Sequence, residues 1–393
     1  MRRILFLDHT PFVGGAELAL LDHIRYLDRA RFEPQVACSS AVPDLVERFQ
    51  GAGARTHVVD WPRLRQPNAT TVWRVIATFR RLRRIIRHEA IDLVVANTSR
   101  TAYIAAAALA GSSTPVVWWV RDFDFGRRWF RLLSRVPRRI VCVSNAVREH
   151  YGGSASSKFS VVFVGNDLHD RVAAHSVEEL LALRSRLGIQ PTDIVVGFMG
   201  RLVEGKGPED LLDAVEQIRP EFPRLRLVFV GTGKGQDGDV EDRLRQRVNH
   251  AGLTNVVRMV GHRAEESLFY QMFDVFVLSS RYREAMPTSV IQAMMACKPV
   301  IATRTGGTPE VVLDGETGIL VPPRQPAAIA DALRRVLSDP QMARRLAAAG
   351  NAYVMSRHRQ EPLTRQVEAV YDSVLAAARP TVDLKRSRPR SQT

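Results

Sequence analysis

The feature that most constrains the fold is an alternation of short apolar runs with longer amphipathic segments, in two successive series. The first series lies at residues 4–8, 35–39, 57–60, 92–97, 115–120, 139–144 and 160–164, and the second at 194–199, 225–230, 256–260, 274–280, 299–303 and 318–321. Continuous runs rich in Val and Ile are typical of parallel strands that helices cover on both faces. The alternation predicts an α/β chain with two Rossmann-like doubly wound domains that face each other across a cleft.

The domain boundaries follow from length and turn chemistry. A chain of 393 residues is longer than one hydrophobic core usually supports, so two domains are expected. The turn cluster Gln-Pro-Thr-Asp at 190–193 separates the two series. We predict a first domain over 1–188, a second over 189–360, a helix over 361–378 that crosses back to the first domain, and a disordered basic tail over 379–393.

The charge of the chain points to an anionic partner. The formal net charge is +15, which suits a nucleotide diphosphate, lipid headgroups or nucleic acid without choosing among them. The arginines from Arg74 to Arg87 share a predicted helix with apolar residues, and a second basic and aromatic run follows at 127–139. These stretches are either solvated basic faces or contacts with an anionic membrane surface. Nucleic acid is disfavoured, because no recognition motif accompanies the charge.

Compartment is indicated by the cysteines and by the apolar runs. Cys38, Cys142 and Cys297 are odd in number, far apart and set in apolar runs, which predicts buried thiols in a reducing compartment. The first apolar run is too short for a signal peptide, and no stretch reaches the ~20 apolar residues of a membrane span. We expect a cytoplasmic location, at the inner face of the cell membrane if the basic helix contacts lipid.

The most informative motif lies at residues 279–304. An apolar strand runs into a charged loop that ends at Glu284, and a helix then begins with Pro287 in its first turn, where a missing N–H costs nothing. Gln292 follows eight residues after Glu284. This spacing resembles the Glu-x7-Glu signature of the retaining glycosyltransferases of family 4, which have the GT-B fold. The segments 297–302, 306–312 and 314–322 are similar to the family's usual continuation.

The resemblance implies roles within this motif. Glu284 would bind hydroxyls of the transferred sugar. Four residues at the helix start would meet the same sugar or the phosphate: Ala285, Met286, Pro287 and Thr288. The family's second glutamate binds ribose hydroxyls, and Gln292 stands in its place. A glutamine both accepts and donates but brings no charge, so the affinity for the donor is in question more than its geometry. The alternative for Gln292 is a helix residue that faces solvent.

A second motif, from Gly200 to Gly207, follows the first strand of the second series and precedes a helix. Arg201 can contact two phosphate oxygens, Lys206 supplies a point charge, and the N–H groups of the helix start face an anion. The family uses an arginine and a lysine at matching positions to hold the diphosphate. Arg201, Lys206 and Glu284 are therefore the predicted catalytic residues; the alternative is a solvated loop with incidental charges.

Two later glycine turns are weaker signals. Gly231 ends a strand of the second series, and a Gly-x-Gly turn alone is more often structural than functional. Its place among the other motifs favours a contribution to the nucleotide pocket. The resemblance implies that Gly261, His262 and Arg263, which follow the next strand, lie near the nucleobase.

The first series carries its own candidates. Gly14 and Gly15 begin a helix after the first strand, where a ligand could approach closely, and they resemble the family's glycine loop over the donor; a structural turn is the alternative. Glu17 suits the helix dipole better than catalysis. Arg121 stands where many relatives carry a histidine that contacts the sugar. It could bind an anionic sugar or an acceptor carboxylate or phosphate, or it could pair with Asp122.

A metal is not expected. The run Asp122-Phe123-Asp124 mimics the metal-binding Asp-x-Asp of the GT-A transferases, but two Rossmann-like units and a separate Arg/Lys diphosphate site argue against that use. We predict no metal and no cofactor, with the nucleotide-diphosphate sugar as co-substrate.

These implications define the expected activity. The second domain would bind a nucleotide-diphosphate sugar, and the sugar would move with retention of configuration to a glycan or lipid-linked acceptor on the first domain, in cell-envelope or exopolysaccharide synthesis. Two alternatives stay open. A sugar-nucleotide epimerase of the same fold would need further acid and base carboxylates, which the sequence does not offer. A sugar-nucleotide-binding or scaffolding subunit is favoured only by the departures at Gln292 and Arg121.

Overall fold

The computed structural model describes residues 1–10, 14–39, 42–61, 69–123, 126–153, 156–172, 175–233, 239–263 and 265–378, with only the backbone of 69 and 70. The chain divides into two compact units. Unit 1 comprises Met1–Val143, Arg148–Val162 and the chain from Glu361 on, and unit 2 comprises Ser144–Val147 and Phe163–Gln360. The predicted tail at 379–393 lies outside the described residues.

Unit 1 contains a sheet of 7 parallel strands in the order β3-β2-β1-β4-β5-β6-β7. Its strands are β1 (Arg2–Leu7), β2 (Phe32–Cys38), β3 (Arg55–Val58), β4 (Leu93–Ala96), β5 (Val116–Val120), β6 (Arg139–Cys142) and β7 (Phe159–Val161). The order reverses between β1 and β4, which pair in parallel with Ile4 opposite Leu93. Ligands of doubly wound sheets bind beyond the carboxyl ends of the strands at such a switch point.

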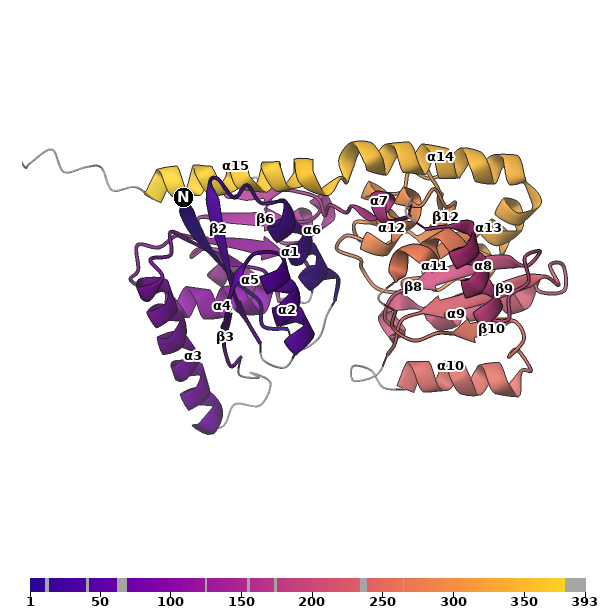
Figure 1. Ribbon diagram of the computed structural model, residues 1–393, viewed down its shortest axis with the longest axis horizontal. Coiled ribbons are helices and arrows are strands. Elements are labelled where there is room, and N and C mark those ends of the chain that lie inside the picture. Colours follow the sequence, from indigo (N-terminus) through magenta and orange to yellow (C-terminus); the bar gives the residue numbers. More distant parts are fainter. Residues whose placement is uncertain are drawn as a thin grey trace, which may run out of the picture. The chain divides into compact units, whose positions relative to one another are not determined.

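Helices cover both faces of this sheet (Figure 1). Leu5 and Leu7 of β1 are buried in one cluster with side chains of α3 and α4, whereas the ring of Phe6 contacts His23 of α1 and Tyr371 of α15. Successive strand residues point to opposite faces, so β1 anchors both helical layers. The helices up to residue 150, together with α15, are α1 (Gly15–Tyr26), α2 (Pro43–Gly51), α3 (Ala69–His88), α4 (Ser99–Ala108), α5 (Arg127–Leu133), α6 (Asn145–His150) and α15 (Gln360–Ala378).

Unit 2 contains a sheet of 6 parallel strands in the order β10-β9-β8-β11-β12-β13, which reverses between β8 and β11. The strands are β8 (Ile194–Met199), β9 (Leu225–Val230), β10 (Val257–Met259), β11 (Val275–Leu278), β12 (Val300–Thr303) and β13 (Ile319–Val321). Both sheets lie where the apolar runs predict strands. The α/β class with two Rossmann-like doubly wound sheets is therefore confirmed.

The faces of the second sheet are also covered by helices. Phe198 and Phe229 are buried with side chains from α9, α10 and α13. On the other face a Cβ at Gly197 would lie 2.2 Å from the ring of Phe273, so the end of α11 packs directly on β8. The elements are α7 (Leu168–Val172), α8 (Val177–Arg186), the 3-10 turn η1 (Glu204–Lys206), α9 (Pro208–Ile218), α10 (Asp239–His250), α11 (Glu266–Met272), α12 (Thr288–Met295), the 3-10 turn η2 (Thr308–Glu310), α13 (Pro326–Ser338) and α14 (Pro340–Arg357).

The division between the units differs from the predicted boundary at 188. Apart from a four-residue segment, unit 2 begins at Phe163, because α7 and α8 pack on it. The N–H of Asn166 donates to the carbonyl of His358 over 2.8 Å, and the His175 ring contacts the Ser267 hydroxyl at 2.7 Å. The turn cluster at 190–193 therefore lies inside unit 2.

One cysteine prediction is wrong. Cys38 and Cys142 are buried, but Cys297 is exposed. It follows the end of α12 with a positive φ of 56°, because the chain turns there toward β12. Within the described residues, no helix combines the length and the apolar character that crossing a membrane requires.

Candidate functional site

The catalytic candidates of unit 2 lie at the switch point of its sheet. The loop after β8 carries Arg201 and the turn η1, and the loop after β11 carries Glu284. The two loops are tied together by the hydroxyl of Ser279, which donates to the carbonyl of Gly207 over 2.7 Å, and by the N–H of Arg281, which donates to the carbonyl of Gly205 over 2.9 Å. The sheet order thus brings together two motifs that are about 80 residues apart.

Lys206 and Glu284 form an ion pair at this junction. The Lys206 Nζ donates to the Glu284 Oε1 over 2.6 Å, and the side chains are 24% and 12% exposed. The hydroxyl of Ser280 donates to the same carboxylate oxygen. Burial alone would raise the pKa of Glu284, but the charge and hydrogen bond of Lys206, the Ser280 hydroxyl and the charge of Arg201 lower it below its ordinary value. The carboxylate is therefore held ionised.

Glycines allow the backbone to approach Glu284 closely. Gly306 has a φ of +51°, and a Cβ there would lie 2.1 Å from the carbonyl oxygen of Glu284. The next N–H, that of Gly307, donates to the same oxygen over 2.7 Å. Only glycine combines this φ with this contact, so the Gly-Gly motif fixes the position of Glu284.

Arg281 holds the loop after β11 against α9, a role that sequence reasoning missed. Its Nε and one terminal nitrogen donate to the two carboxylate oxygens of Asp210 over 3.0 and 2.6 Å, and its other terminal nitrogen lies 3.2 Å from Glu209. Hydrogen bonds to Asp210, together with the nearby carboxylate charges, raise the pKa of Arg281 above its ordinary value. This two-pronged contact stiffens the segment that carries Glu284.

The other unit 2 candidates line the same edge of the sheet. Arg201 is exposed and lies two residues after the end of β8. Gly231 has a φ of +134°, and a Cβ there would lie 1.9 Å from the carbonyl oxygen of Gly200, so this turn requires glycine for packing. Gly261 pairs with Gly231 and has open space around it, while the adjacent His262 and Arg263 are exposed. The half-buried Ala285 and the buried Met286 precede α12, whose N-cap is the buried Pro287 and whose first residue is the half-buried Thr288. Pro287 therefore lies one position before the helix and not in its first turn.

Gln292 is buried, with 8% of its surface exposed, so the solvent-facing alternative does not hold. Its amide oxygen accepts from the hydroxyl of the fully buried Tyr270 over 3.0 Å, and its amide nitrogen donates to Glu266 over 3.2 Å. Glu266 begins α11 and is half-buried. A carboxylate thus stands beside the glutamine, and no local pattern in the sequence indicates this.

In unit 1 the predicted residues also lie at the switch point. Gly14 is the N-cap of α1 and Gly15 its first residue; the N–H of Gly14 donates to Glu17 over 2.9 Å. Glu17 is buried, and its burial and the nearby charge of Asp8 raise its pKa to about 7. Arg121 follows β5 and donates from Nε to Asn97 over 2.9 Å. These residues belong to unit 1, whereas the other predicted site residues belong to unit 2.

No metal site is evident in the part of the chain that the structure describes: it holds no group of three or more His, Cys, Asp and Glu side chains arranged to bind an ion. Of the Asp-x-Asp run, Asp122 accepts from the Ser99 hydroxyl over 3.2 Å. Asp124 lies outside the described residues.

The chain matches two family models. Residues 181–353 match the model described as Glycosyl transferases group 1, and residues 13–170 match the model described as Glycosyltransferase Family 4. The first match contains the Arg201–Lys206 loop and the Glu284–Gln292 motif, and the second contains the glycine turn at Gly14 and Arg121. The two matches therefore include the motifs of both units.

Relatives and solved structures agree with these matches. A D-inositol 3-phosphate glycosyltransferase of Streptomyces bingchenggensis is 33% identical over 50% of this chain and 44% of its own length. The lipopolysaccharide core biosynthesis mannosyltransferase LpsB of Rhizobium meliloti is 27% identical over 62% of this chain and 75% of its own. The chain spans about half the length of the first curated relatives that it matches. Anabaena Alr3699/HepE in complex with UDP-glucose superposes with a TM-score of 0.82 at 25% identity, over 95% of this chain and 100% of that one.

Proposed function

The chain belongs to the GT-B glycosyltransferases of family 4, the glycosyl transferases group 1; from this membership we propose that it moves a sugar from a nucleotide-diphosphate sugar to a glycan or lipid-linked acceptor. We propose transfer with retention of configuration, in cell-envelope or exopolysaccharide synthesis. The name of LpsB, a lipopolysaccharide core biosynthesis mannosyltransferase, supports this acceptor class. The name of the D-inositol 3-phosphate glycosyltransferase supports a sugar transferase without supporting a glycan acceptor. The UDP-glucose complex of HepE supports the donor class.

The observation that carries the proposal is the ion pair of Lys206 with Glu284 at the switch point of unit 2, beside Arg201. Two cations and an ionised carboxylate at the carboxyl edge of a sheet suit a ligand that is anionic at one end and rich in hydroxyls at the other. A diphosphate attached to a sugar has this character. Glu284 would accept hydrogen bonds from sugar hydroxyls.

The same residues suggest how bond cleavage is assisted. When the bond between the sugar and the diphosphate breaks, negative charge grows on the leaving diphosphate. Arg201 and Lys206 would stabilise this charge, and because Lys206 is already fixed by Glu284, little reorganisation is needed. In this proposal no metal takes part, and the backbone of Ala285 to Thr288 contacts the sugar or the phosphate. Gly261, His262 and Arg263 would meet the base.

Donor binding is tested by thermal unfolding with UDP, GDP, ADP and dTDP and their sugars, each with and without EDTA. A ligand at about 100 times its dissociation constant adds ~2.7 kcal/mol of stability, so one nucleotide should raise the melting temperature in both conditions. Arg201→Ala should remove most of that increase without unfolding the protein, because Arg201 is exposed. Arg345→Ala, which removes an exposed arginine of α14 in the same unit, should retain it.

Other outcomes would change the assignment. Stabilisation that disappears with EDTA would contradict metal-independent binding. If no nucleotide stabilises the chain, the assignment of a donor site is wrong, and a scaffolding role explains the chain better. If Arg201→Ala and Arg345→Ala behave alike, the loop after β8 does not hold the diphosphate.

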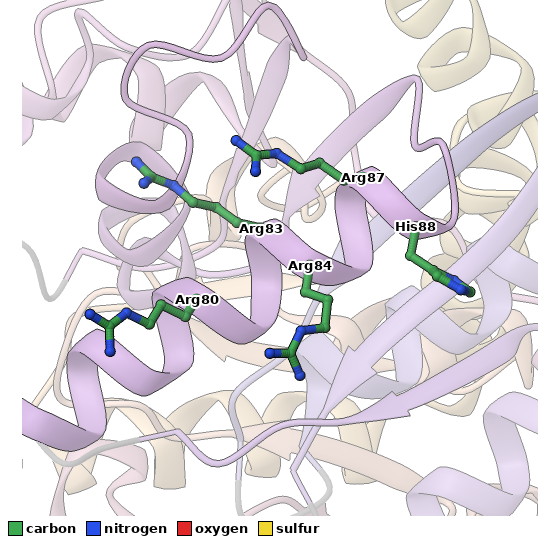
Figure 2. A pocket seen from close by; sticks show the side chains of 5 residues that line it. All are labelled: Arg80, Arg83, Arg84, Arg87 and His88. Carbon is green, nitrogen blue, oxygen red and sulfur yellow. The ribbon is translucent and has the colours of Figure 1, made fainter.

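We propose that an anionic membrane surface is a second partner, bound through α3. Figure 2 shows Arg80, Arg83 and Arg87 on one side of this helix, with Arg84 and His88 on the other, around a hollow that all five line. Arg83 donates from Nε to the carbonyl of Ala108 over 2.5 Å and thus caps the C-terminus of α4. Four other arginines of α3 are exposed and form no ion pair with any described residue: Arg80, Arg81, Arg84 and Arg87. Trp73 on the same helix is 67% exposed.

Membrane binding is tested by co-sedimentation with vesicles that contain anionic lipid. Each cation near such a surface contributes ~1 kcal/mol, so replacing all four of these arginines by alanine should abolish binding that is measurable at low salt. The control removes the same charge from exposed arginines of unit 2: Arg186, Arg335, Arg344 and Arg345. Binding that is equally reduced in both variants would show a net-charge effect and contradict a dedicated surface.

A further inference from the structure

Arg121 lies at the switch point of the first sheet in a position that two neighbouring side chains define. It follows β5 directly, and its Nε donates to the side-chain oxygen of Asn97 over 2.9 Å. Its guanidinium carbon lies 4.2 Å from the centre of the Trp119 ring, so the cation rests on an aromatic face. One edge and one face of the guanidinium are thereby fixed.

The support beneath Arg121 is itself buried and hydrogen-bonded. Asn97, with no exposed surface, donates from its amide nitrogen to Asp8 over 2.9 Å, and Asp8 is 1% exposed. The other oxygen of Asp8 accepts from the N–H of Thr10 over 3.0 Å. This orientation sets both ends of the Asn97 amide, with the oxygen toward Arg121. The chain Asp8–Asn97–Arg121 thus links the carboxyl ends of β1, β4 and β5.

The terminal nitrogens of Arg121 are not used by this support. A guanidinium carries five N–H donors, of which one is at Nε and four are on the two terminal nitrogens. Among the residues that the structure describes, none accepts a hydrogen bond from these terminal nitrogens. Both oxygens of Asp8 are engaged by Asn97 and Thr10, and Glu17 accepts from the N–H of Gly14. The nearby carboxylates therefore influence Arg121 by charge without ion-pair contact.

We propose that Arg121 is an anion receptor, whose two terminal nitrogens bind a phosphate or carboxylate group that a substrate carries to unit 1. A planar fork of donors, fixed by stacking and by its Nε bond, matches two oxygens of such a group. The inference rests on the proposed function for the statement that the anion belongs to a transferase substrate. The site itself needs no turnover to be measured.

The charged groups around Arg121 give the site a pH dependence. The groups whose charge bears on it are Asp8 after β1, Glu17 and His23 on α1, and Tyr371 on α15. Burial lowers the pKa of His23 to about 3 and raises that of Tyr371 well above its ordinary value, so neither changes charge near neutrality. Burial and the charge of Asp8 raise the pKa of Glu17 to about 7. Burial also raises the pKa of Asp8, so the two carboxyl groups titrate as a pair.

Glu17 therefore couples anion binding to a proton. Above about pH 7 Glu17 is ionised, and its negative charge repels the incoming anion and offsets the positive charge of Arg121. Below that pH Glu17 is neutral and this repulsion is absent. Binding of an anion should favour the protonated form of Glu17. The affinity for glucuronate, whose own charge is constant in this range, should fall as the pH rises from about 6 to 8, with proton uptake on binding. A purely structural arginine would show neither effect.

The experiment measures the affinity for inorganic phosphate and glucuronate by calorimetry at constant ionic strength, with glucose as a neutral probe. All proteins carry Arg201→Ala, which removes one of the two cations of the anion site proposed for unit 2. Arg121→Lys keeps the cation but loses the fork and should weaken anion binding by about tenfold or more. Arg121→His, which places there the residue common in the family, guards against a folding defect and should weaken anions similarly. The control is Arg357→Lys, whose arginine also stacks on an aromatic ring, that of Tyr353 at 4.9 Å.

The outcomes separate this inference from the proposed function. Three results would overturn the anion-receptor inference, whether or not nucleotides bind. They are equal anion affinity with and without Arg121, no anion binding at all, and binding of glucose alone. Anion binding that depends on Arg121 supports it even if no nucleotide binds. Two further arms identify the source of the anion. If the affinity for a nucleotide uronate depends more on Arg121 than the affinity for the neutral nucleotide sugar does, the anionic group belongs to the transferred sugar. If the nucleotide-loaded protein binds glucose 6-phosphate and the Arg121→Lys variant does not, the anionic group belongs to the acceptor.

Discussion

A Lys206→Met variant is expected to unfold at a lower temperature than the wild type and to lose nucleotide-diphosphate binding. Methionine retains most of the volume but leaves Glu284, which is 12% exposed, without its cation. Breaking a buried ion pair by removing one partner costs about 3–5 kcal/mol, and the cost here should fall toward the lower end because Lys206 is 24% exposed. For a domain of this size each kcal/mol lowers the melting temperature by about 2–4 °C.

The pH dependence identifies the cause of that loss. In the wild type the pKa of Glu284 is below its ordinary value, so its stabilising effect is present at neutral pH and lost as the pH falls through the folded-state pKa. In the variant burial dominates and the pKa rises, so ionised Glu284 destabilises at neutral pH and this penalty disappears on acidification. The difference in melting temperature should therefore shrink below about pH 4. A Lys158→Met control, whose lysine donates to two backbone carbonyls and pairs with no carboxylate among the described residues, should show a pH-independent difference. A pH-independent difference for Lys206→Met as well would contradict the ion-pair explanation.

A Gly306→Ala variant should lose nearly all nucleotide-sugar turnover. The added Cβ would lie 2.1 Å from the carbonyl oxygen and 2.8 Å from the nitrogen of Glu284, so the segment that carries this carboxylate must move. A displacement of about 1 Å in a catalytic arrangement can reduce the rate about a hundredfold. The measurement is steady-state turnover of the nucleotide sugar that stabilises the wild type, together with the melting temperature.

Gly315→Ala is the matched control. Gly315 also has a positive φ, +76°, but an added Cβ would meet nothing within 4 Å. The variant should therefore lose only about 1–2 kcal/mol of unfolding free energy, the cost of an alanine in the left-handed conformation, and it should keep its turnover. If both variants lose stability and activity equally, the contact between Gly306 and Glu284 does not determine the site.

The sequence predicts the fold well because its signal is local. Buried parallel strands are continuous apolar runs, and those at 194–199 and 225–230 coincide with β8 and β9. The domain boundary was harder to predict. The turn at 190–193 has the composition of a linker. However, Arg184 donates to the carbonyls of Gln190 and Asp193, over 3.0 and 2.6 Å, and holds the turn inside unit 2.

Parts of the candidate site depend on contacts between distant residues, which no local pattern reveals. The family resemblance assigns Lys206 and Glu284 to one site, and the structure brings them together because both follow strands that meet at the switch point. The partners of Gln292, Tyr270 and Glu266, come from another helix. The contact of Arg281 with Asp210 likewise joins segments that are 71 residues apart. Such pairs follow from the packing of α9, α11 and α12, which periodicity alone does not determine.

The position of α15 bears on how the chain is made. Tyr371 is buried against Phe6, Phe32 and His23, and Glu368 accepts from the N–H of Asp28 over 2.7 Å, so this helix completes the core of unit 1. Yet it is synthesised after the whole of unit 2. On the ribosome, nearly all of unit 2 is available as one continuous segment while unit 1 still lacks a helix. The half that is translated first is therefore finished last, and its uncovered aromatic face is the surface that a nascent-chain chaperone would have to shield.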